Sequence, residues 1–165
     1  MKSFVFLTSV IFLTTAVCAE EVPIIGNVGA KCVINTDTNG VYGNPTSDKL
    51  STAVADGGVL PIVRYDVTLA DAYKAKITTP TSFASAPALT DSVTWTGSTT
   101  VKEMSDAAMA GYEAAKVEYD ATDEYDLTEA GSVWFESSST ATYGFGKSFP
   151  GGVYRAVVVA ECIAK

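Results

Sequence analysis

Residues 62–70 alternate between apolar and polar side chains, and this pattern limits the fold more than any other feature of the sequence. The apolar positions are Val63, Tyr65, Val67 and Leu69. The polar positions between them are Arg64, Asp66 and Thr68. A period of two residues is that of a β-strand with one buried face. We therefore predict a strand here and expect the other elements to be organised around a sheet.

Further strand patterns recur along the chain, at residues 26–35, 73–77, 92–96, 99–102, 132–136, 140–145 and 153–163. Segments 92–96 and 99–102 are expected to form a hairpin across Gly97-Ser98, and residues 36–58 to be mostly loop. Because residues 153–163 are apolar on both faces, we predict a central or covered strand there. Short strands separated by turns predict an all-β fold, an immunoglobulin-like sandwich.

One short helix is expected at residues 105–116. Ser105 is a candidate N-cap, and Asp106 suits the positive end of the helix dipole. Alanine is frequent in this stretch, whereas Gly111 weakens the helical pattern.

The amino terminus has the order of a secretory signal. Lys2 precedes an uncharged stretch over residues 4–17, and Val17-Cys18-Ala19 offers a cleavage site. The stretch is shorter than the roughly 20 apolar residues that span a bilayer. We predict a signal peptide at 1–19 and one exported domain at 20–165. A membrane anchor and lipidation of Cys18 are the alternatives.

Removal of the signal peptide leaves two cysteines, Cys32 and Cys162. An even pair in an exported chain predicts a disulfide, here between nearly the first and nearly the last residues of the domain. Two buried free thiols, or a metal site without histidine, are the less favoured interpretations.

Composition argues against several classes of function. The formal net charge is −8, which disfavours nucleic acid and anionic membrane surfaces as partners. The chain has no histidine, so there is no imidazole base or histidine-containing triad. We find no glycine-rich phosphate loop, and we expect neither an enzyme nor a cofactor.

Acidic residues gather between residues 118 and 129. A calcium site built from Asp120, Asp123, Glu124 and Asp126 is a weak candidate, because calcium favours oxygen ligands. An EF-hand loop requires a glycine where Tyr125 stands. A solvated acidic loop is therefore the favoured interpretation, and no metal is expected.

Aromatic residues are dense in the second half of the chain. They are Tyr112, Tyr119, Tyr125, Trp134, Phe135, Tyr143, Phe145, Phe149 and Tyr154. At strand spacing such residues are more often core than a surface for sugar or protein recognition, and core is the favoured interpretation.

The predicted mature amino terminus, residues 20–28, is also alternating. Val22, Ile24, Gly26 and Val28 share one face of an extended segment. An apolar row at a chain end suits a strand donated to a neighbour, whose side chains fill pockets while its main chain pairs with a sheet edge. An ordinary first strand of the same sheet is the alternative.

These features together resemble chaperone–usher pilin subunits. The resemblance rests on the signal peptide, the alternating segment with Gly26, the strand series and the sequence Gly151-Gly152-Val153-Tyr154 before the last strand. Further short segments resemble the major subunits of alpha-clade colonisation-factor fimbriae. They are Ala55-Asp56-Gly57-Gly58, Leu89-Thr90-Asp91, Val93-Thr94-Trp95, and residues 99–104 and 108–112. The cysteine pair departs from that clade.

The resemblance implies an incomplete immunoglobulin-like fold that lacks one strand. A periplasmic chaperone would fill the gap, and residues 20–28 of the next subunit would replace it at the usher. The implied function is a structural subunit of an extracellular fimbria, with copies of itself as partners and a role in adhesion or biofilm through a surface receptor. The alternative is a secreted monomeric β-sandwich that binds sugar or calcium. Neither predicts membrane insertion.

Overall fold

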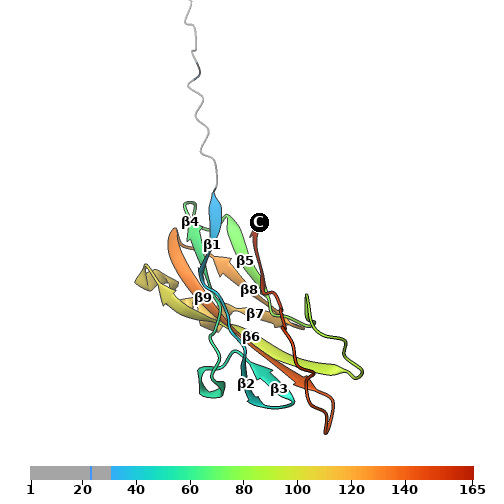
Figure 1. The fold of residues 1–165 in the computed structure, drawn as a ribbon. Helices are drawn as coiled ribbons and strands as arrows, with labels where there is room; N and C mark the ends of the chain where they lie inside the picture. The colour runs from blue at the N-terminus through green and yellow to red at the C-terminus, as the bar shows by residue number, and fades with distance from the viewer. Residues whose placement is uncertain (1–22, 24–30) are drawn as a thin grey trace, which may run out of the picture.

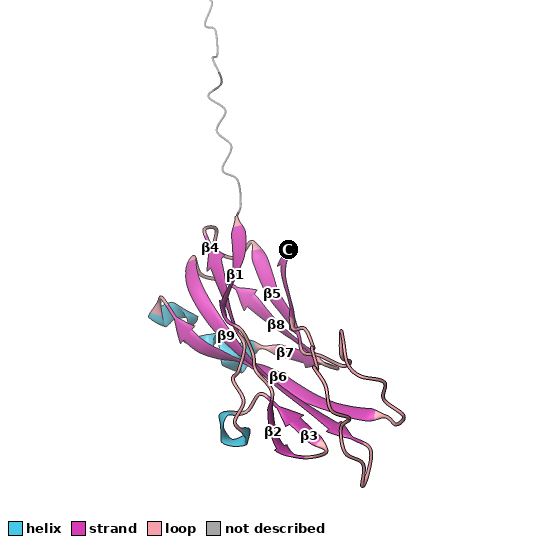
Figure 2. Ribbon diagram, viewed as in Figure 1, coloured by secondary structure: helices cyan, strands magenta, loops and turns pink. Residues whose placement is uncertain are grey.

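The computed structural model describes residue 23 and residues 31–165, which form two antiparallel sheets packed face to face (Figures 1 and 2). The larger sheet contains β1 Cys32–Thr38, β2 Gly43–Thr46, β3 Lys49–Ser51, β4 Ile62–Val67, β6 Val93–Met104 and β9 Gly131–Tyr143. The smaller sheet contains β5 Tyr73–Thr78, β7 Val117–Tyr119, β8 Thr122–Leu127 and β10 Val159–Ala164. The prediction of an all-β sandwich is confirmed.

Strand β9 organises the larger sheet. Its first half pairs with β4 and its second half with β3 on one edge, while β6 runs along the other edge. Strand β1 continues the sheet beyond β4. The smaller sheet has the order β10-β5-β8-β7. As a result β1 and β10 are edge strands, one in each sheet.

The core lies between the sheets and follows the predicted alternation. Tyr65 of β4, Tyr125 of β8 and Phe135 of β9 are fully buried, with ring centroids of Tyr65 and Tyr125 at 5.5 and 4.5 Å from that of Phe135. The alternation predicted for residues 62–70 is confirmed as far as Val67. Leu69 lies beyond the end of β4 and is 40% exposed, so its assignment to the core was wrong.

The hairpin predicted across Gly97-Ser98 is wrong, because β6 runs unbroken from Val93 to Met104. Gly97 serves close approach rather than a turn. A Cβ atom on it would lie 2.7 Å from the Ser138 carbonyl oxygen and 2.9 Å from Thr79 Oγ1. Likewise the segments predicted at 132–136 and 140–145 join into the single strand β9, and residues 36–58 contain the hairpin β2–β3 and the short helix η1 Val54–Asp56.

The predicted helix at 105–116 is confirmed in part. It consists of the 3-10 turn η2 Ala107–Gly111 and the single α-helical turn α1 Tyr112–Ala115. Asp106 caps it by accepting a hydrogen bond from the Ala108 N–H, while Ser105 Oγ instead accepts from the Ser132 N–H. Among the described residues, no helix has the length and apolar character needed to cross a membrane.

The carboxyl-terminal segment differs from the prediction of a long central strand at 153–163. Strand β10 begins only at Val159 and lies at a sheet edge. Before it, a single bridge pairs Arg155 with Ser85. Burial still alternates, with Tyr154, Ala156, Val158, Ala160 and Cys162 half-buried on the inner face. The second apolar face is therefore exposed rather than covered by a neighbouring strand.

Candidate binding groove

The predicted disulfide between Cys32 and Cys162 is confirmed, and it joins the two edge strands β1 and β10 across the sandwich. The two Cα atoms are 6.3 Å apart. Close by, the buried Tyr65 hydroxyl donates to the carbonyl oxygens of Glu161 in β10, at 3.2 Å, and Lys76 in β5, at 3.3 Å. One end of this side of the sandwich is therefore closed by a covalent bond and a hydrogen bond.

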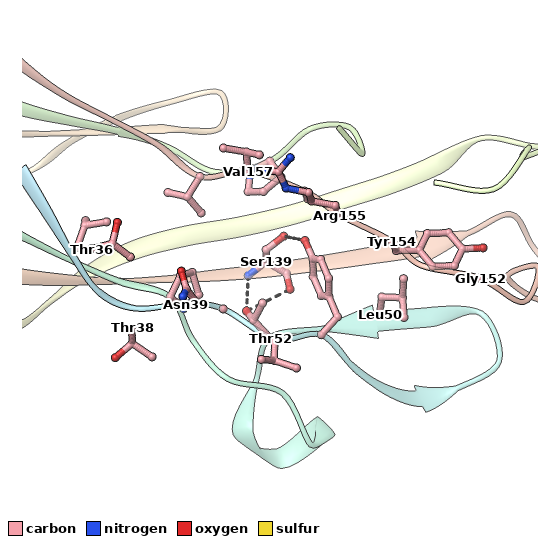
Figure 3. A pocket seen from close by; sticks show the side chains of 18 residues that line it. Thr36, Thr38, Asn39, Leu50, Thr52, Ser139, Gly152, Tyr154, Arg155 and Val157 are labelled. Atoms are coloured by element: carbon pink, nitrogen blue, oxygen red, sulfur yellow. Dashed lines mark hydrogen bonds between the residues drawn. The ribbon is translucent and has the colours of Figure 1, made fainter. Parts of the chain in front are cut away.

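Beyond this closed end, the end of β1 and the segment that precedes β10 diverge and border a cavity of about 720 Å³ (Figure 3). Residues 36–42, which begin in β1, line one side, and residues 152–158 line the other. Leu50 and Val63 of the larger sheet add apolar surface. We call this cavity the groove, and the end near Gly152 its open end.

The floor of the groove is polar but internally satisfied. Tyr42 Oη lies 2.8 Å from Ser139 Oγ, and the Ser139 N–H donates to Thr52 Oγ1 at 2.9 Å (Figure 3). Burial raises the pKa of Tyr42, so this hydroxyl stays neutral over the physiological range. Among the described residues, no buried side-chain nitrogen or oxygen lacks a partner. The groove thus combines apolar side chains, including Leu50, Val63 and Val158, with a paired Tyr42–Ser139–Thr52 floor. Thr36, Thr38, Asn39 and Arg155 add further polar groups to the lining.

The two rims of the groove also offer main-chain groups. Among the described residues, β1 pairs with β4 alone, Val41 forms a single bridge with Val59, and residues 152–158 form only the bridge between Arg155 and Ser85. The opposite edge of each segment faces no other strand of the described chain. An edge of this kind is a template for an added strand.

On the other long side of the sandwich, side chains are bonded to main-chain groups of β6. The Thr99 N–H donates to Asp123 Oδ2 at 2.6 Å, and the Thr99 carbonyl accepts from Tyr125 Oη at 2.7 Å and Lys116 Nζ at 3.1 Å. The Val101 N–H donates to Glu113 Oε2 at 2.8 Å. Side chains from β8 and α1 therefore occupy the main-chain groups that an added strand would need.

The four candidate calcium ligands do not converge. Asp123 points into the sandwich toward Thr99, while Glu124 and Asp126 lie on the outer face within 3.7 and 3.9 Å of Lys74 Nζ. Asp120 sits in the turn between β7 and β8 with φ of 51°. No group of three or more histidine, cysteine or acidic side chains is placed to hold a metal ion in the part of the chain that the structure describes.

The predicted donor residues Val22, Ile24, Gly26 and Val28 lie outside the described residues. The preference for aromatic residues in the core is confirmed for Tyr112, Tyr125, Phe135 and Tyr143, which are buried. It is wrong for Tyr119, which is 43% exposed, and for Phe145, which is fully exposed. Tyr154 packs edge-on against Phe83 and Phe149 beside the open end of the groove.

Sequence reasoning identified residues 153–163 as strand-like but missed that half of them lack a strand partner. The apolar residues on both faces of this segment were compatible with this outcome, because a segment of that kind exposes apolar surface when it lies at an edge. Val153, Val157 and Val159 are indeed exposed.

No family model, no curated protein and no solved structure matches this chain. The groove, its closed end and the occupied edge of β6 therefore rest on the geometry of this molecule alone.

Proposed function

We propose that this chain is a structural subunit of an extracellular fimbria or filament, and that it polymerises by strand donation. In this proposal the fold is an immunoglobulin-like sandwich that lacks one strand, and the groove is the place of that strand. The observation that carries the proposal is the open side between β1 and residues 152–158, which has free main-chain edges and apolar walls. The contrast with the occupied edge of β6 supports it.

The proposed occupant is the amino-terminal segment of a second copy, residues 20–28. Its inward residues, Val22, Ile24, Gly26 and Val28, would replace water against Leu50, Val63 and Val158 of the groove. Burying a valine or isoleucine side chain contributes roughly 1.5–3 kcal/mol. Main-chain pairing with a rim would add directional hydrogen bonds.

Before assembly, an open groove is a hazard, because an exposed edge invites unspecific pairing. This is the physical reason to expect a periplasmic chaperone that covers the groove in transit and an usher that exchanges it. The protein would then reside at the cell surface, with a role in adhesion or biofilm. Its acidic surface agrees with partners other than nucleic acid.

The test is size-exclusion chromatography with light scattering on oxidised residues 20–165. Three proteins are compared: wild type, Ile24→Asp, and Asn27→Asp as the control on the other face of the same segment. We expect ordered oligomers from wild type and the control, and monomers from Ile24→Asp, because burying a charge against the apolar side chains of Leu50, Val63 and Val158 is costly. Stable monomers in all three cases would instead favour the secreted binding module.

A further inference from the structure

Resting on that proposed function, we propose that the Cys32–Cys162 disulfide is a stop within the groove. It restricts the inserted strand to about seven residues from a second copy, which enter from the open end near Gly152. The rest of the edge, along residues 32–35 and 159–163, stays without an added strand.

The closed end of the groove lacks the room for a third strand. Neighbouring strands in a sheet lie about 4.8 Å apart, so a strand between two others needs them roughly 9.5 Å apart. The Cα atoms of Cys32 and Cys162 are 6.3 Å apart and covalently joined. The hydrogen bond from Tyr65 to the Glu161 carbonyl holds β10 near the larger sheet at the same level. A third strand does not fit there.

The length of the groove matches the length of the proposed inserted strand. The groove is lined over residues 36–42 on one rim and 152–158 on the other. At about 3.3 Å per residue, such a rim accepts an extended segment of about seven residues, roughly 23 Å long. Residues 22–28 have this length, and they begin and end on the inward-facing residues Val22 and Val28. The charged Glu20 and Glu21 would then remain in solvent beyond the stop.

The position at which the amino-terminal segment joins β1 disfavours insertion into the same molecule. Residues 20–30 lead through Lys31 directly into Cys32, the first residue of β1 and a member of the disulfide, so they join the domain at the closed end of the groove. Residues 20–30 would have to reverse direction and pass β1 as far as Thr36 before reaching the groove. Covering the distance from Cys32 to Thr36 would use about half of residues 20–30, at 3.3 Å per residue.

A second copy meets no such obstacle. Its segment enters at the open end, with its own domain left outside, and runs antiparallel to residues 152–158. The occupant is therefore a neighbouring molecule.

The test is hydrogen–deuterium exchange with mass spectrometry, comparing assembled wild type with unassembled Ile24→Asp. We expect assembly to slow exchange at residues 36–42 and 152–158 while exchange at 32–35 and 159–163 stays the same. Slowed exchange along the whole of β1 and β10 would overturn the stop but leave strand donation standing. If assembly leaves both rims unchanged, strand donation fails as well.

A second measurement uses Ile24→Asp as the acceptor and synthetic peptides of residues 22–28 and 20–28 as probes, because Glu20 and Glu21 are the residues that would lie at the disulfide. Because the additional residues lie outside the groove, the two dissociation constants should agree within about threefold. An affinity at least tenfold higher for the longer peptide would show that pairing continues past the disulfide and would overturn the stop.

Discussion

The two long sides of this sandwich solve the problem of exposed strand edges in opposite ways. Along β6, main-chain groups of Thr99 and Val101 are bound by side chains from β8 and α1. Along β1 and residues 152–158, the edges are joined by one disulfide at one end and left open at the other. Natural sheets generally block their edges, so an edge left open beside an apolar groove indicates a surface kept for a partner.

The comparison also teaches where each side obtains its stability. The β6 side depends on several hydrogen bonds to the main chain of β6, made by the charged residues Asp123, Glu113 and Lys116. The groove side depends on the disulfide, which joins residues 130 positions apart, and on the hydrogen bond from Tyr65 to the Glu161 carbonyl. Loss of the disulfide, of the Asp123 side chain or of the buried tyrosine hydroxyls should therefore mainly lower the stability of the fold. A charge at Val157 should instead mainly block assembly.

The largest effect is expected from loss of the disulfide. In the chain-entropy model, closing a loop of this length stabilises the fold by about 4–5 kcal/mol. The double variant Cys32→Ser/Cys162→Ser should lose most of that free energy of unfolding, as measured by urea denaturation under oxidising conditions. Wild type in reductant serves as the matched comparison. Equal denaturation midpoints for oxidised and reduced wild type would show that the groove side does not depend on this bond.

The next largest effect is expected at the β6 side from Asp123→Ala. Asp123 is 5% exposed, and its removal leaves the buried Thr99 N–H without an acceptor. An unsatisfied buried donor costs about 1–3 kcal/mol, which urea denaturation would resolve. Asp126→Ala on the same strand is the control. Asp126 is exposed and pairs with Lys74 and Lys165, so its loss should cost under about 1 kcal/mol.

If Asp123→Ala and Asp126→Ala lower the free energy of unfolding equally, the hydrogen bond from Thr99 to Asp123 does not stabilise the β6 edge more than a surface ion pair does. Asp123→Ala should also aggregate more readily than Asp126→Ala, because the uncapped edge of β6 is free to pair with another strand.

An intermediate effect is expected at alkaline pH from the two buried tyrosines. Burial raises the pKa of Tyr65 and of Tyr125 well above the ordinary value of 10.0. Because the folded state holds the neutral phenol, its full stability is present below pH 10 and declines as pH rises beyond it. Each tyrosine contributes a slope of about 1.4 kcal/mol per pH unit.

Tyr65→Phe removes a hydroxyl shared between the Glu161 and Lys76 carbonyls, and Tyr125→Phe removes the hydroxyl bonded to the Thr99 carbonyl. Each substitution should cost about 1 kcal/mol at neutral pH and should flatten the alkaline decline. Urea denaturation between pH 8 and about pH 11.5 measures both quantities. An unchanged slope in either variant would mean that the corresponding hydroxyl is not shielded from water in solution.

Much of this architecture follows from patterns visible in the sequence. The period of two at residues 62–70 predicts β4, and the position of the two cysteines predicts the link between the first and last strands. These features depend on local alternation or on residue type alone, which is why sequence reasoning captures them.

Other features depend on contacts between distant segments. Gly97 resembles a turn residue but lies in the middle of β6, because the Ser138 carbonyl and Thr79 leave no room for a side chain. Asp123 resembles a surface acid within an acidic run, yet it is buried because Thr99, distant in sequence, supplies an N–H donor. The groove itself follows from the divergence of two edges, which no local pattern encodes.

The smallest effect on stability, and a complete effect on assembly, is expected from Val157→Lys. Val157 lines the groove and is 45% exposed, so lysine there should change the free energy of unfolding by less than about 0.5 kcal/mol. An edge lysine blocks the addition of a strand, so this variant should stay monomeric by light scattering. The matched control is Val117→Lys, because Val117 is 56% exposed in β7 at the opposite edge of the smaller sheet. That variant should assemble like wild type. Assembly by Val157→Lys and failure by Val117→Lys would reverse the assignment and make β7, rather than the groove, the edge that copies of this chain use.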